Sequence, residues 1–257
     1  MANTVYENRV IEAKAKDLLT TSLNTRTLMT VDNSLTQSAG MIKTVNLYTY
    51  SGTAEELEAG EGNTNKGSIT YAGVDYKVKR VQQTFEYTDD DFLKDNLIVD
   101  NMLKGANQVM VNKMTADFIG ECGKATVKQT LTGDISYDAI VDGISKLNLE
   151  DESKLFIVIP NAWKAALRKD EDYKSARMGE VVYNGQVGTI AGIPVIATKA
   201  LTDAAYIMTN EAVKLFMKRD VEVEQDRDIE KKINTVVLAT YYVCALEDAT
   251  KICKLSA

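Results

Sequence analysis

One long helical pattern, over residues 88–123, constrains the fold of this chain more than any other stretch. Thr88 can cap a helix, and three aspartates follow in the first turn, where exposed backbone N–H groups favour negative charge. Gly123 offers a stop. The predicted helix is about 50 Å long, too long for one small core to bury on all sides, so we expect it to lie across a sheet. The apolar stripe comprises Phe92, Val99, Leu103, Ala106, Met110, Met114 and Phe118, and Leu93, Met102 and Val109 widen it.

Composition describes an ordinary globular protein. The chain has 257 residues, of which 45% are hydrophobic and 26% charged. No apolar run approaches the roughly 18–20 residues of a membrane helix, and the charged N-terminus has no apolar signal core. We therefore expect no membrane contact, and a protein made and folded in a cytoplasm.

Residue usage argues against most active sites. Histidine is absent, which removes Ser–His–Asp and Cys–His constellations and histidine-bearing zinc sites. The three cysteines form no CxxC pair and are predicted to be buried free thiols. The net charge is −7 and no basic footprint stands out, so sequence-specific nucleic-acid binding is not expected.

Two carboxylate clusters and one glycine-rich segment also have structural explanations. Asp89, Asp90 and Asp91 suit the first turn of a helix, whereas the acidic residues at 222–228 suit the solvent face of a strand and its turn. The glycines of residues 183–192 do not form GxGxxG and do not open a helix. We therefore predict no catalytic, cofactor-binding or metal-binding residues.

The first 45 residues are interpreted as an arm. Apolar residues between Val5 and Leu19 recur at roughly helical spacing and predict one short amphipathic helix. The Thr-, Ser- and Asn-rich segment after it has no clean period, and alone it buries too little surface to offset its ordering entropy. Two alternatives stay open: a frayed terminus, or an arm ordered by lying on another copy of the protein.

Residues 41–87 predict a long two-stranded arm. Alternating apolar residues at 41–50 and 69–87 indicate strands, and a loop rich in glycine and glutamate joins them. Because an isolated hairpin is only marginally stable in water, an arm of this length needs a partner surface. An ordinary surface hairpin is the alternative, but the length and position of the arm favour an interaction element.

Residues 125–210 predict an α/β module. It begins with a connection that turns at Gly133, followed by a helix over 137–149 capped by Ser136. The continuous apolar run at 155–160 predicts a strand buried on both faces.

The second half of this module should hold a helix and further strands. Asn161 is expected to cap a helix that begins at Ala162 and places Trp163 in the core. A charged loop follows, then a hairpin at Asn184-Gly185 and two more strands.

Residues 211–257 predict a long hairpin with a polar tip near 225–232 and a final strand at 252–255. We expect these strands to form the sheet on which the 88–123 helix lies.

The order and spacing of these segments resemble the major capsid proteins of tailed bacteriophages, which share the Hong Kong 97-type fold. In that family a strand of the G-x-x-x-G-x-P-V type is followed by a short apolar strand. Next along the chain come an A-V-like strand with Lys-Arg, a stretch in which acidic and aliphatic residues alternate, and a closing strand. The resemblance covers nearly the whole chain. The matching positions are Gly188, Gly192, Pro194, Val195, Ala212, Val213, Lys218, Arg219, Glu222, Glu224, Asp226 and Asp248.

The resemblance implies an α+β fold in four parts. Residues 1–45 correspond to the N-arm and residues 46–86 to an extended β-hairpin loop that lies over a neighbouring subunit. Residues 87–124 and 211–257 correspond to the peripheral domain, a long spine helix on a β-sheet. Residues 125–210 correspond to the axial α/β domain at capsomer centres.

The implied function is structural. Many copies would form hexamers and pentamers that close an icosahedral phage head around double-stranded DNA without sequence-specific binding. The expected partners are the protein itself, a portal and, because the arm is short, a separate scaffold protein. The protein would be assembled in the host bacterial cytoplasm and reside in the virion. The expected subunit-contact residues are Glu55, Glu56, Glu58, Glu61, Lys66, Asp226, Arg227, Asp228 and Lys231.

Two other functions are weighed against this one. An encapsulin-like cellular nanocompartment shell has the same fold, but its subunits usually begin with a helix rather than a Thr/Ser-rich arm. A cytosolic α/β enzyme is disfavoured by the missing histidine and the absent cofactor motif. Nothing in the sequence singles out a partner for Lys66, so no crosslink is predicted.

Overall fold

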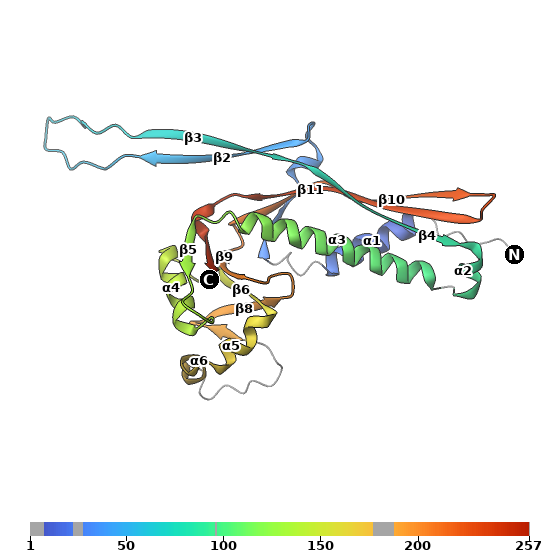
Figure 1. The fold of residues 1–257 in the computed structure, drawn as a ribbon. Coiled ribbons are helices and arrows are strands. Elements are labelled where there is room, and N and C mark those ends of the chain that lie inside the picture. The colour runs from blue at the N-terminus through green and yellow to red at the C-terminus, as the bar shows by residue number, and fades with distance from the viewer. Residues whose placement is uncertain (1–7, 23–27, 96, 177–187, 257) are drawn as a thin grey trace.

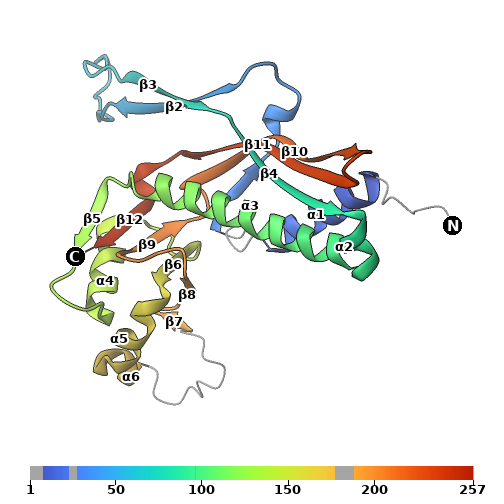
Figure 2. The same ribbon diagram turned by 45° about the vertical axis from the view of Figure 1, so that its right-hand side comes forward.

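The computed structural model describes residues 8–22, 28–95, 97–176 and 188–256. Helix α3 (Ile98–Cys122) runs along one face of a four-stranded sheet, and its C-terminal end reaches a six-stranded sheet (Figure 1). A third, two-stranded sheet extends away from both (Figures 1 and 2). No helix of the described residues is long and apolar enough to cross a membrane.

The four-stranded sheet supports the long helix, as the sequence predicted. Its order is β1-β10-β11-β4, with β1 parallel to β10 and the other pairs antiparallel. Leu103, Met110 and Met114 of α3 are buried against it together with Val236 and Leu238 of β11. The strands are β1 (Thr30–Asp32), β4 (Lys79–Thr88), β10 (Val213–Asp228) and β11 (Ile233–Leu246).

The six-stranded sheet has the order β5-β12-β9-β6-β8-β7. Helix α4 (Tyr137–Leu147) buries Ile140 and Ile144 on one face, whereas the other face contacts the end of α3 around Cys122. The strands are β5 (Val127–Thr130), β6 (Leu155–Pro160), β7 (Thr189–Ile190), β8 (Ile193–Thr198), β9 (Ala204–Thr209) and β12 (Ile252–Ser256). The short helices are η3 (Asn161–Trp163), α5 (Lys164–Lys169), α6 (Glu171–Ala176) and η4 (Ala249–Lys251).

The long helix is interrupted, so the expectation of an unbroken helix over 88–123 is wrong. Thr88 caps a short helix, α2 (Asp89–Lys94), in a capping box with Asp91. The chain then turns because the Asp95 carboxylate accepts a hydrogen bond from the Leu97 N–H at 2.9 Å, and α3 begins at the next residue. Leu93 and Val109 do not widen the buried stripe: both are exposed.

The described part of the N-terminal arm packs on its own chain. Helix α1 (Asn8–Ser22) confirms the predicted amphipathic helix, with Ile11 and Ala15 buried in the core shared by α3 and the sheet. Lys14 pairs with Asp100 of α3 at 2.9 Å, and Lys16 pairs with Asp220 of β10. The frayed alternative is therefore wrong for α1, and contact of the arm with another copy stays a prediction.

The arm predicted at 41–87 divides into two sheets at Val78. Only β2 (Ile42–Ser51) and β3 (Ser68–Lys77) form the projecting hairpin, whereas β4 joins the four-stranded sheet beside β11. Val78 is buried, and its N–H donates to the Met41 carbonyl at 2.8 Å. The apolar alternation changes phase here, from even to odd positions, which explains the division.

Several further elements correct the sequence interpretation. Residues 127–130, expected as a connection, form β5, and the final strand β12 lies in the six-stranded sheet rather than beneath α3. Asn161 does not cap a helix, because its side-chain Oδ1 is buried without a partner. Helix α5 confirms the helix expected after Asn161, although it begins at Lys164; the charged loop that follows contains α6, and Trp163 is only half-buried. The hairpin expected at Asn184-Gly185 lies outside the described residues.

Other expectations are confirmed. Ser136 caps α4 by accepting from the Ala139 N–H at 3.2 Å, and all six residues of β6 are buried. Gly133 turns the chain with a φ of +123°. The three cysteines are buried and free.

Candidate functional site

Strand β3 of the β2–β3 hairpin is exposed on both faces. Every residue of β3 except Tyr76 is exposed, and the pair projects from the body (Figure 1). Large apolar side chains nevertheless lie on it, namely Ile42, Tyr50, Ile69, Tyr71 and Val74. Such a concentration of exposed apolar surface is typical of a protein–protein contact.

A small separate core fixes the root of this hairpin. Val45 and Val78 pack with Leu35 and with Phe216 and Val243, which lie on the sheet face opposite α3. The Lys43 ammonium lies 4.7 Å from the centre of the Phe216 ring, a cation–π contact. The hairpin is therefore held at a defined place on the body although its strands are exposed.

The loop that joins β2 to β3 is organised by its own polar groups. Glu55 accepts hydrogen bonds from the Thr64 N–H and hydroxyl, both at 2.8 Å, and these bonds lower the pKa of its carboxyl below the usual value. Glu55 therefore stabilises the loop, whereas Glu56, Glu58, Glu61 and Lys66 are exposed. At the mouth of the loop the Tyr50 ring lies so close to Gly67 that a Cβ there would come within 2.1 Å of its hydroxyl oxygen.

The turn between β10 and β11 is the second projecting end. Arg227 pairs with Asp89 of α2 at 2.6 Å, and Asn234 donates to the same carboxylate at 2.9 Å. The Asp228 carboxylate accepts from the backbone N–H groups of Glu230 and Lys231, both at 3.0 Å. Asp228 thus shapes the turn and Arg227 ties it to α2, and all four predicted residues of this end, Asp226, Arg227, Asp228 and Lys231, are exposed.

Sequence reasoning missed the apolar residues at this end. Ile229 is 73% exposed in the turn, and Leu93 of α2 is 80% exposed. Ile229 lies in a segment interpreted only as a polar tip, and a large aliphatic residue among charges was the available signal. The predicted contact residues form two groups at opposite ends of the molecule, one at the hairpin loop and one at the β10–β11 turn (Figure 1).

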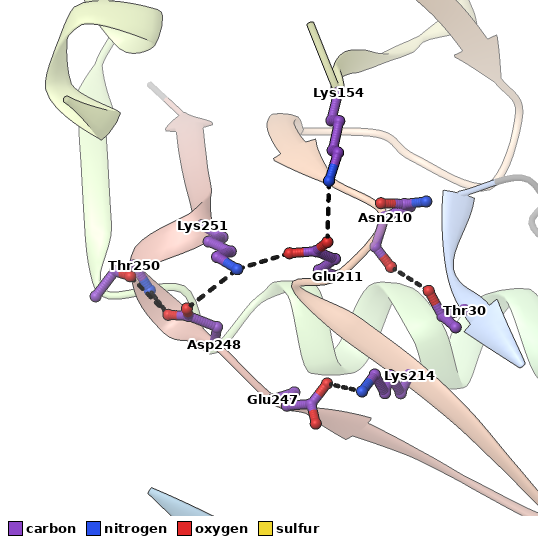
Figure 3. Close-up of polar contacts among 9 residues, drawn as sticks. All are labelled: Thr30, Lys154, Asn210, Glu211, Lys214, Glu247, Asp248, Thr250 and Lys251. Carbon is purple, nitrogen blue, oxygen red and sulfur yellow. Dashed lines mark hydrogen bonds and ion pairs between the residues drawn. The ribbon is translucent and has the colours of Figure 1, made fainter. Parts of the chain in front are cut away.

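A polar cleft of about 700 Å³ lies where the chain passes between the two larger sheets. Glu211, between β9 and β10, pairs with Lys251 at 2.7 Å and with Lys154 at 3.5 Å (Figure 3). Glu247 pairs with Lys214 at 2.5 Å. The Lys251 hydrogen bond lowers the pKa of Glu211, and the same bond raises the pKa of Lys251. The charges of the cleft are mutually paired, which suits a clamp between the sheets.

The described residues offer little for chemistry. Within them, no group of three or more His, Cys, Asp or Glu side chains could hold a metal ion. Burial raises the pKa of the Cys244 thiol to about 12 and also raises that of Cys122, so both are held as unreactive thiols. Burial likewise raises the pKa of Tyr242, whose hydroxyl donates to Asp117 at 2.9 Å.

This fold is that of virus-shell proteins. The capsid structure of the cyanophage P-SCSP1u matches with a TM-score of 0.73 and 12% identity, covering 90% of this chain and 86% of that one. A virus-like particle from Pyrococcus furiosus matches with a TM-score of 0.67 and 14% identity over 98% and 100% of the two chains. The expected Hong Kong 97-type fold is confirmed.

Sequence comparison gives the family. The profile of the phage capsid protein family matches residues 71–255. A major capsid protein of Staphylococcus phage phiMR11 is 25% identical over 237 residues, covering 88% of this chain and 84% of that protein. The chain therefore belongs to the phage capsid protein family, and it is a structural protein rather than an enzyme.

Proposed function

We propose that many copies of this chain form the hexamers and pentamers of an icosahedral phage head that encloses double-stranded DNA. The observation that carries this proposal is the β2–β3 hairpin, whose apolar side chains are exposed on a projecting two-stranded sheet. Because such a hairpin is marginally stable alone, burial against neighbouring copies supplies the missing contacts.

The proposal divides the subunit into the four parts that the resemblance implies. Residues 46–86 include the extended loop, and α3 with the four-stranded sheet corresponds to the peripheral domain. The six-stranded sheet corresponds to the axial domain, with β12 contributed by the last residues of the chain. The β10–β11 turn, with Ile229 exposed, is proposed to meet other subunits.

The remaining partners rest on the resemblance. A separate scaffold protein, a portal and packaged DNA are proposed, with assembly in the host bacterial cytoplasm. The net charge of −7 suits a container that holds DNA without gripping it. An encapsulin-like shell, which would have the same fold, is the second candidate.

Electron microscopy of the purified protein, with nuclease-protected DNA measured on the particles, tests the proposal. Closed shells that protect double-stranded DNA are expected. DNA-free shells that hold an enzyme would favour the encapsulin-like alternative. A monomer that never assembles at high concentration and salt, with or without scaffold, would contradict both.

Deletion of residues 54–66 tests the role of the loop. The loop contributes no residue to the buried clusters, so the subunit should fold with an unchanged melting midpoint while shell assembly is impaired. An unfolded subunit, or normal assembly of the shortened chain, would contradict the assignment.

A further inference from the structure

One edge of the six-stranded sheet carries lysines that form no ion pair with any described residue. Strand β5 is the edge strand, paired in parallel with β12, and Lys128 of β5 lies directly opposite Lys254 of β12. Directly opposite residues point to the same face, so the two ammonium groups are neighbours. Like charges in this position destabilise a sheet, and within the described residues neither lysine forms an ion pair.

A third lysine reaches the same edge from the other face. Lys146, in the last turn of α4, donates from its ammonium to the Lys128 carbonyl at 3.1 Å. Cys253 and Leu255 of β12 are buried beneath α4, so Lys254 points away from that helix. Two exposed lysines, Lys128 and Lys146, therefore lie at the edge strand, and a third, the half-buried Lys254, lies on the neighbouring strand, in a protein whose net charge is −7.

The hairpin loop carries the complementary charge. Glu56, Glu58 and Glu61 are exposed, and none forms an ion pair within the part of the chain that the structure describes. Glu55 differs from them, since Thr64 already occupies its carboxylate. Thus three unpaired carboxylates project on the loop, and three lysines lie at or next to one sheet edge.

We propose that the β5 edge, with Lys128, Lys146 and Lys254, binds the acidic hairpin loop of a second copy of this chain. This inference rests on the proposed function, because it places the loop on a neighbouring subunit of the shell. The lysines would attract the three carboxylates, and the loop would lie along a strand edge that has no outer neighbour among the described elements. The contact would also relieve the repulsion between Lys128 and Lys254.

Edge lysines have another known role, which is to discourage edge-to-edge aggregation. The two roles differ in their dependence on the acidic loop. If the lysines only protect the edge, the charge of Glu56, Glu58 and Glu61 has no bearing on them.

A charge exchange tests the proposal by measuring shell yield at fixed salt. Three variants are compared. The lysine variant carries Lys128→Glu and Lys254→Glu. The loop variant carries Glu56→Lys, Glu58→Lys and Glu61→Lys, and the combined variant carries all five changes. Each partial variant should lower the yield of shells by about tenfold, because it places like charges in contact. The variant with all five changes should recover most of the wild-type yield.

Controls separate folding, the contact and the proposed function. Lys104→Glu, at an exposed position of α3, should leave the yield unchanged. If a charge-reversal variant fails to fold, judged by its melting midpoint, the variant with Lys128→Gln and Lys254→Gln tests the same contact by removing the positive charges without introducing repulsion. Wild-type yield from the lysine variant, or no recovery in the variant with all five changes, would overturn this inference but not the proposed function. Failure of the wild-type chain to form shells would instead contradict the proposed function.

Discussion

Two long antiparallel hairpins, β10–β11 and β2–β3, have opposite surroundings. β10–β11 has α3 and α1 on one face and buries Val221, Val236 and Leu238. β2–β3 projects into solvent and leaves Tyr50 and Ile69 exposed (Figure 2). The difference suggests a division of roles, in which one hairpin stabilises the subunit and the other stabilises the assembly.

The largest expected effect comes from a substitution in the buried core that covers β10–β11. Leu103→Ala removes a fully buried side chain of α3 and should lower the free energy of unfolding by about 2–5 kcal/mol, measured by urea denaturation of the subunit. The matched change on the exposed hairpin, Ile69→Ala, should cost less than about 0.5 kcal/mol. Equal costs would remove the distinction between the core that covers β10–β11 and the exposed β2–β3 hairpin.

A smaller effect is expected where β4 leads into α2. Thr88→Ala removes the hydroxyl that accepts from the Asp91 N–H at 3.1 Å, and should lower the free energy of unfolding by about 1 kcal/mol. Thr70→Ala, at an exposed position of β3, serves as the control in the same thermal or chemical denaturation. A similar loss at both positions would show that the cap contributes nothing.

The smallest effect concerns the clamp between the two larger sheets. Lys251 lowers the pKa of Glu211 below its usual 4.5, so this pair stabilises the fold above that pH and loses its effect as the pH falls through the lowered pKa. Glu211→Gln should therefore lower the melting midpoint slightly at pH 7, and the difference from wild type should shrink in acid. A difference that is constant from pH 7 to pH 3 would contradict this account.

Local patterns predicted the elements whose burial is decided within the chain. The bounds of β11 and β6 follow from continuous or alternating apolar runs, and Ser136 marks the start of α4. The break at Asp95 was missed because an aspartate turn competes with a helical apolar stripe that continues across it. The pairing of β5 with β12 was missed because parallel strands far apart in sequence leave no local signal.

Contact residues were the least accessible to sequence reasoning. Charge singled out Arg227 and Asp228, and within the subunit Arg227 pairs with Asp89 of α2 while Asp228 accepts from the Glu230 N–H; their contact with other subunits stays a prediction. The same reasoning passed over Ile229, which is exposed at the end of that turn. A sequence pattern records which residues are apolar or charged, but whether a partner surface covers them depends on neighbouring copies.

Hydrogen–deuterium exchange of the subunit and of the assembled shell tests the central claim most directly. The amides of β10 and β11 should be protected in both states, because α3 and α1 already cover one face of their sheet. The amides of β2 and β3 should exchange rapidly in the free subunit and become protected in the shell. Equal protection of β2 and β3 in both states would contradict the claim that this hairpin is stabilised by its neighbours.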